Sequence, residues 1–157
     1  MRPRSVLPPV LAILIASPAL AVDDRWTSGT GQGTVEASIR SRTGSTFRVF
    51  CGSGTTDRQM GIVLEGLATT VPKGRPLDVQ IIVDGKNFPF ALTDGYGLVS
   101  ARSSRFDLEA MAKAMLASKA TSFTIEYPSL DKSETFSLAD VADALSDRGG
   151  TIVTPCL

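Results

Sequence analysis

The sequence contains no histidine among its 157 residues, and this absence removes several classes of function. Ser-His-Asp and Cys-His nucleophile systems, histidine general bases and most zinc, copper and haem sites all require an imidazole. The formal net charge is zero, without the basic excess typical of nucleic-acid-binding proteins. We therefore expect no cofactor, no metal ion and no nucleic-acid partner.

Long hydrophobic runs are also scarce, and the one apolar run lies at the N-terminus. Arg2 and Arg4 precede an apolar stretch over residues 6–15, and Ala19 and Ala21 then provide the small side chains of a signal-peptidase site. This order predicts a signal peptide over residues 1–21, cleaved after Ala21.

The alternative interpretation of this run is an uncleaved membrane anchor. A bilayer-spanning helix needs about 20 apolar residues. This run is shorter, and Pro8, Pro9 and Pro18 interrupt it. The rest of the chain, residues 22–157, has no stretch long enough to cross a membrane. We expect it to form a single exported domain, located in the periplasm or secreted.

The two cysteines, Cys51 and Cys156, are expected to form a disulfide, because exported proteins mature in an oxidising compartment. Closing a loop of roughly 100 residues stabilises a protein by up to about 4.7 kcal/mol in the chain-entropy model. Two free thiols or an intermolecular bridge are the alternatives. An oxidised pair excludes thiol catalysis.

Alternation of apolar and polar residues predicts a succession of β-strands after a flexible, glycine-rich segment at residues 22–33. Asp84-Gly85 and Asp94-Gly95 are strong hairpin-turn signals, and Pro89 favours an edge position because it lacks a ladder donor. The predicted strands cover residues 34–40, 46–51, 59–67, 77–84, 88–93, 96–101, 121–127, 133–136 and 151–154.

Helical periodicity predicts two helices, over residues 104–118 and 138–148. Ser104 and Ser137 are the expected N-caps, and the glycine pair at 149–150 ends the second helix. This order of elements indicates an α+β fold, with an antiparallel sheet, half-barrel or sandwich on which two helices pack.

Two patterns of residues resemble known catalytic sites. Ser129 and Lys132 match the Ser-x-x-Lys motif of penicillin-recognising enzymes, but they lie in a predicted turn and the companion motifs are missing. Asp140, Asp143 and Asp147 line one side of the second helix, which is typical of a solvated face.

Two further groups of residues are weighed as binding sites. Arg40 and Arg42 share a strand face, with Arg48 near them, so they are a candidate patch for an anion or an acidic partner; an ordinary solvated face is the alternative. Met111 and Met115 follow a helical stripe that is typical of a core-facing surface rather than a ligand site.

The C-terminal third resembles two groups of exported bacterial proteins. The run TSFTIEYPSLDKSETFSLADVADAL, followed by a late cysteine, is similar to the ending of type VI secretion accessory proteins of the TagO/VasI type. VQIIVDGKNFPFAL, with the same Phe-Ser-Leu helix start, resembles the invasion-associated locus B family. Both usually carry a glycine where this chain has Ala139 or Asp140, and the second family's additional cysteines are missing. The resemblance implies an exported, non-enzymatic accessory protein and transfers no functional residue.

Signal peptide, missing histidine and resemblance together predict a non-catalytic, exported accessory or binding protein of the cell envelope. Its partner is expected to be a protein or another envelope component. One alternative is an inhibitor of a host or rival enzyme such as lysozyme. The other alternative is a histidine-free hydrolase that uses Ser129 and Lys132.

Overall fold

The computed structural model describes residues 24–31, 33–52, 59–67, 73–99 and 102–146. Several sequence predictions lie outside these ranges: the signal peptide at 1–21, Asp147, the glycine pair at 149–150, the strand at 151–154 and Cys156. Cys51 is 2% exposed on the third strand. Its predicted bond to Cys156 stays a prediction.

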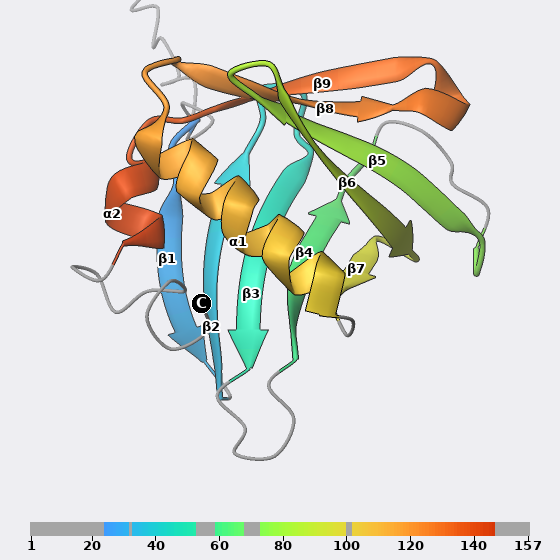
Figure 1. Ribbon diagram of the computed structural model, residues 1–157, viewed down its shortest axis with the longest axis horizontal. Helices are drawn as coiled ribbons and strands as arrows, with labels where there is room; N and C mark the ends of the chain where they lie inside the picture. The colour runs from blue at the N-terminus through green and yellow to red at the C-terminus, as the bar shows by residue number, and fades with distance from the viewer. Residues whose placement is uncertain (1–23, 32, 53–58, 68–72, 100–101, 147–157) are drawn as a thin grey trace, which may run out of the picture.

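Nine strands form one open antiparallel sheet in the order β1-β2-β3-β4-β7-β6-β5-β8-β9 (Figure 1). Every pairing is antiparallel, so the α+β prediction with a mainly antiparallel sheet is confirmed. The strands are β1 Thr27–Gly31, β2 Thr34–Arg40, β3 Thr46–Gly52, β4 Met60–Glu65, β5 Pro76–Val83, β6 Lys86–Thr93, β7 Tyr96–Leu98, β8 Ser122–Tyr127 and β9 Lys132–Ser137.

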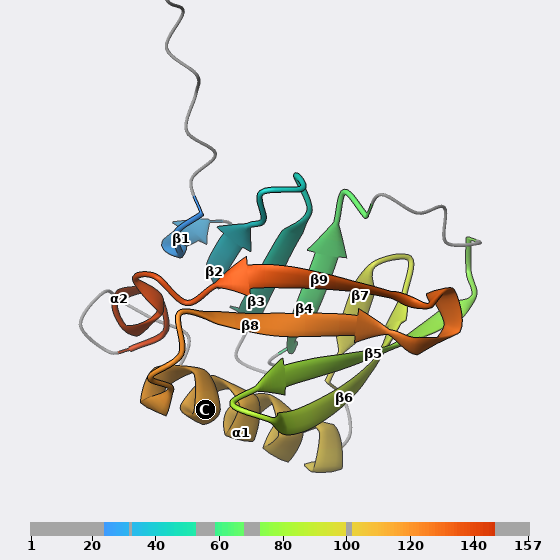
Figure 2. The same cartoon turned by 90° about the horizontal axis from the view of Figure 1, so that it is seen from above.

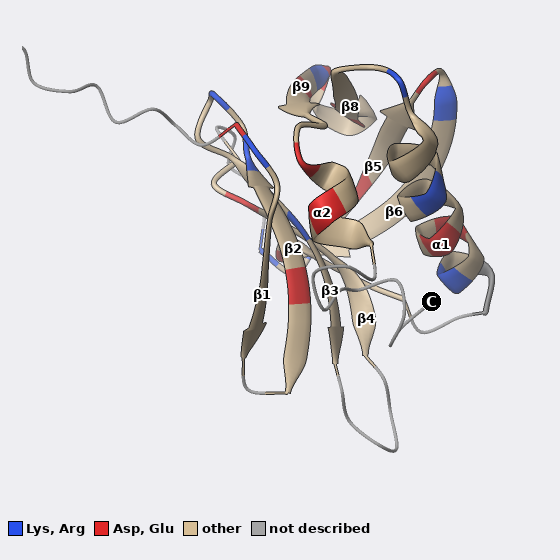
Figure 3. Cartoon of the chain, turned by 90° about the vertical axis from the view of Figure 1, so that its left-hand side faces the viewer, with Lys and Arg blue, Asp and Glu red and all other residues tan. Residues whose placement is uncertain are grey.

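Two α-helices lie on the same side of this sheet (Figures 1 and 3). Helix α1 (Arg102–Ala117) packs on β5 and β6, and helix α2 (Val141–Leu145) packs on β1 and β2. Met111 and Met115 of α1 are fully buried, which confirms that this stripe faces the core. Within the described ranges, no helix has the length and apolar character that a membrane crossing requires.

The sheet consists of two parts that share little backbone pairing. β6 and β7 are joined only through the pair Thr93–Tyr96, whereas β5 and β6 pair along their whole length. Figure 3 shows β1 to β4 on one side and β5, β6, β8 and β9 on the other, with α2 near the centre and α1 beside β6. Pro89 lies on the part of β6 that pairs with β5 alone, as its missing N–H predicts.

The prediction of a flexible segment over residues 22–33 is wrong for its second half. Residues 27–31 form β1 and pair with β2, and Trp26 is only 3% exposed. Trp26 donates its backbone N–H to Ala139 O (3.0 Å) and its indole N–H to Ser137 O (2.9 Å). The sequence does not indicate this strand, because Gly29 and Gly31 contribute no side chain to an alternating pattern.

The predicted helix starts also differ from the structure. Helix α1 begins at Arg102, so Ser104 lies inside its first turn rather than at its cap. Ser137 Oγ accepts the Ala139 N–H (3.0 Å) in a local turn, and α2 begins only at Val141. Leu138 is held to Thr121, and Asp140 has a left-handed φ of 65°, so the helix cannot start earlier.

The close approach of β4 and β7 requires glycine at position 61, and this yields a stability prediction. A Cβ atom on Gly61 meets the backbone carbonyl of Gly97, whereas a Cβ on Gly29 of β1 meets nothing within 4 Å. We expect Gly61→Ala to destabilise the protein by about 1–3 kcal/mol through overpacking. Gly29→Ala, the matched control, should change stability by less than about 0.5 kcal/mol. Urea unfolding measures both, and equal effects would contradict the packing described here.

Candidate functional site

The β8–β9 hairpin supplies most of the candidate site. Its strands are joined by a short 3-10 helix, Pro128–Leu130, and by Asp131, which has a left-handed φ of 50°. Because side chains alternate along a strand, Glu134 and Phe136 face the interior of the protein. Ser133 and Thr135 face the other way and are exposed.

The carboxylate of Glu134 is the central polar group of the site. Ser45 Oγ lies 2.8 Å from Glu134 Oε1, and Tyr127 donates its hydroxyl to Glu134 Oε2 at 3.1 Å. Ser45 Oγ also lies 3.2 Å from Gly66 O. Ser45 and Tyr127 are almost completely buried. The carboxylate therefore links β9 to β8 and to the turn between β2 and β3.

The Tyr127 hydroxyl is held in its neutral form. Burial is the largest cause that raises the pKa of Tyr127 far above its ordinary value of 10.0, followed by the negative charge of Glu134 and the hydrogen bond to it. A phenol in this position donates a stable hydrogen bond.

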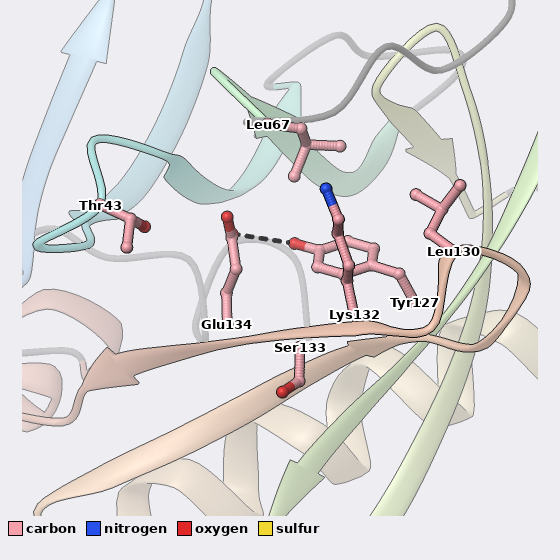
Figure 4. A pocket seen from close by; sticks show the side chains of 7 residues that line it. All are labelled: Thr43, Leu67, Tyr127, Leu130, Lys132, Ser133 and Glu134. Carbon is pink, nitrogen blue, oxygen red and sulfur yellow. Dashed lines mark hydrogen bonds between the residues drawn. The ribbon is translucent and has the colours of Figure 1, made fainter.

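A cavity of about 230 Å³ opens beside Glu134 (Figure 4). Figure 4 shows the side chains of Lys132 and Glu134 on the same side of β9, with Leu67 opposite them and Ser133 pointing away. Leu67 and Leu130 make one end of the cavity apolar. Its lining residues are Thr43, Leu67, Tyr127, Leu130, Lys132, Ser133 and Glu134.

A second, larger cavity of about 550 Å³ continues along β9. It shares Thr43, Ser133 and Glu134 with the first cavity, so the two are contiguous. Hydroxyl groups dominate its lining, together with one ion pair. Its lining residues are Asp24, Arg42, Thr43, Thr121, Ser122, Ser133, Glu134, Thr135 and Ser137. We call the two cavities together the β9 groove.

The three arginines proposed from the sequence do not form one free cationic patch. Arg48 lies between two carboxylates, with Nε 3.4 Å from Glu36 Oε2 and Nη2 3.6 Å from Glu65 Oε2. Arg42 donates Nε–H to Asp24 Oδ2 at 3.0 Å and lines the β9 groove. Arg40, exposed at the end of β2, lines neither cavity. Acidic neighbours offset two of the three charges, which favours the interpretation as a solvated face.

The structure does not bring the residues of either catalytic pattern together in a cavity. Ser129 lies in the 3-10 helix and does not line the cavity that contains Lys132. Asp140 and Asp143 are exposed, and Asp140 accepts a hydrogen bond from Arg25 at 2.7 Å. In the part of the chain that the structure describes, no three His, Cys, Asp or Glu side chains lie close enough to hold a metal ion.

Comparison with known families gives one assignment. The YfjT family model matches residues 24–145, which is most of the chain. The chain belongs to the YfjT family. The match runs from the ion pair of Asp24 to the end of α2, so the β9 groove lies within the YfjT region. No curated protein and no solved structure matches. The resemblance to the type VI secretion and invasion-associated proteins stays a prediction.

Sequence reasoning missed Glu134 and Tyr127, although a signal for one of them was available. In the predicted strand 133–136, Phe136 faces the core, and the two-residue period places Glu134 on the same side. A carboxylate at a core-facing position needs hydrogen-bond donors. The donor Ser45 lies in a distant turn that the sequence does not connect to this strand.

The raised pKa of Tyr127 predicts a pH dependence of stability. Because the unfolded phenol loses its proton first, the stabilisation from the neutral hydroxyl is complete below pH 10 and falls as pH rises above it. The contribution has a slope of up to about 1.4 kcal/mol per pH unit. Tyr127→Phe should remove this part of the alkaline slope in urea unfolding. Tyr96→Phe, at an exposed ring, is the control and should keep the slope of the unmodified protein; a Tyr127→Phe slope that matches it would contradict this role.

Proposed function

We propose that the protein is a non-catalytic, exported binding protein of the cell envelope and that the β9 groove is its binding site. The observation that carries this proposal is the pair of contiguous cavities beside an edge strand, joined at Glu134. The groove combines an apolar end at Leu67 and Leu130 with a polar stretch of hydroxyl groups. This combination suits a ligand that has both apolar and hydrogen-bonding parts.

The chemistry of the groove supports binding more than catalysis. Both oxygens of Glu134 already accept hydrogen bonds from protein hydroxyls, which leaves the carboxylate poorly suited as a general base. The Tyr127 phenol holds its proton tightly because it is buried. The pKa of Tyr127 lies far above the neutral range that favours proton transfer. Their shared effect is to fix the geometry of the groove wall.

The location outside the cytoplasm rests on the N-terminal sequence. Arg2, Arg4 and the apolar run before Ala21 support export. The half-barrel or sandwich form belongs to the same proposal: the sheet is open between β1 and β9, and the helices pack on one side of it, which favours a half-barrel.

Export makes a direct prediction about the mature chain. Protein isolated from its host should begin at Val22, because the signal peptidase cuts after Ala21. Its two cysteines should resist alkylation until a reductant is added. Intact-mass spectrometry with and without reduction tests both points. An intact Met1 together with two reactive thiols would contradict export and the disulfide together.

The binding site is tested by photo-crosslinking in the native host. A benzophenone amino acid at Thr135, on the edge of the groove, should give a discrete crosslinked species. The same group at Ala110, exposed on α1, is the control and should not. Equal crosslinking at both positions, or none at Thr135, would contradict a site in the groove. Turnover of a cell-wall substrate that is lost in Glu134→Gln would contradict the non-catalytic role.

A further inference from the structure

β9 is an edge strand, and its backbone groups point in two directions. In an antiparallel pair, hydrogen-bonded and non-hydrogen-bonded residue pairs alternate. Leu138 donates its N–H to Thr121 O at 2.9 Å, which fixes this alternation along the hairpin. Phe136 and Glu134 therefore exchange bonds with β8, and the N–H and C=O groups of Ser133 and Thr135 point away from it.

The open side of β9 faces the β9 groove. Figure 2 shows β9 between β8 and the upper ends of β2 and β3. Ser133 and Thr135 both line the larger cavity. At the end of the strand, the carbonyl of Ser137 also points away from β8, and it accepts a hydrogen bond from the indole N–H of Trp26. The next two residues with the same orientation, Thr135 and Ser133, present donors and acceptors at the spacing of a strand.

We propose that the groove binds an extended peptide segment of a partner protein, which adds to the sheet as a strand beside β9. This inference rests on the proposed function and specifies its ligand. Main-chain hydrogen bonds to Ser133 and Thr135 supply recognition that does not depend on the peptide's sequence. The two residues span one repeat of the ladder, so the peptide contributes at least three residues in extended form.

The smaller cavity selects one side chain of that peptide. Side chains of an added strand alternate between the two faces of the sheet. A side chain on the inner face, level with Lys132 and Glu134, enters the cavity of about 230 Å³ that ends at Leu67 and Leu130. Those two leucines favour an apolar side chain. The peptide residues on either side of it face Ser133 and Thr135 and are expected to be polar.

The shape of the groove favours a single chain over a second copy of the protein. Asp24, Arg42 and Thr43 form the wall opposite β9. Strands in a sheet lie about 4.8 Å apart. A second copy that paired through its own β9 would bring β8 with it and place that strand against the wall. One extended segment needs no second strand.

The Thr135→Pro variant tests whether a ligand binds by strand addition or in another way. It removes the N–H that points into the groove and keeps the ladder to β8, because edge positions tolerate proline. Ser28→Pro is the matched control. Ser41 donates its N–H to Ser45 O, which fixes the residues of β2 that form hydrogen bonds with β3. The residues between them form hydrogen bonds with β1. In the β1–β2 register this leaves the Ser28 N–H on the open side of β1. Both variants should unfold at nearly the temperature of the unmodified protein.

The probe is a phage-displayed library of random peptides, panned on the full protein after export and oxidation. We expect enriched peptides with one apolar residue between polar ones. A synthetic peptide of the enriched sequence should bind the Thr135→Pro variant at least about tenfold more weakly and the Ser28→Pro variant unchanged. Leu67→Ala should also weaken binding. N-methylation of peptide amides should abolish binding at every second position only, a readout that does not depend on any protein variant.

The outcomes separate this inference from the proposed function. Peptides that bind the Thr135→Pro variant as tightly as the unmodified protein overturn strand addition, while crosslinking at Thr135 can still support a site in the groove. The absence of any enriched peptide also overturns strand addition. A dimer in sedimentation analysis that Thr135→Pro converts to a monomer overturns it in favour of a second copy. Failure of the groove itself appears as an absence of crosslinks at Thr135.

Discussion

Packing among four aromatic rings holds the two parts of the sheet together. Trp26 and Phe47 belong to the β1–β4 side, and Phe123 and Phe136 to the β8–β9 hairpin. The ring centroids of Phe47 and Phe123 lie 5.5 Å apart, and those of Phe123 and Phe136 lie 5.4 Å apart. Such pairs are worth about 0.5–1.5 kcal/mol beyond their burial. β6 and β7 share a single residue pair, so the backbone ladder connects the two parts of the sheet only weakly. The rings add a side-chain contact between the two parts, from β3 to the β8–β9 hairpin.

This aromatic packing creates the groove as a consequence. With Phe136 fixed against Phe47 (6.1 Å), the preceding part of β9 lies beside the turn between β2 and β3. Glu134 then meets Ser45, and the residual space along the strand becomes the two cavities. Trp26 contributes twice, since its ring packs on Phe47 and its indole N–H occupies the end of the β9 edge. The groove is thus built from residues far apart in the chain.

Local patterns predict the elements better than their arrangement. Alternation from Leu77 to Val83 and the Asp84-Gly85 turn predict β5 and its hairpin partner well, since both signals are short-range. β1 could not be predicted, because its pairing with β2 and the burial of Trp26 depend on tertiary contacts. The start of α2 was misplaced for the same reason: Leu138 and Ala139 use their backbone groups for distant partners. The groove depends on such contacts throughout.

An open strand edge can bind a ligand, but it can also pair with another copy of the protein, and the structure disfavours such pairing. Edge strands with free N–H and C=O groups promote association between copies. Here the charged side chains of Lys132 and Glu134 lie on β9, and the Asp24–Arg42 ion pair stands on the opposite wall. Charges and a wall disfavour pairing with another sheet, and the two cavities beside β9 are where the proposed peptide binds. The same features that protect the edge therefore define the kind of ligand that fits it.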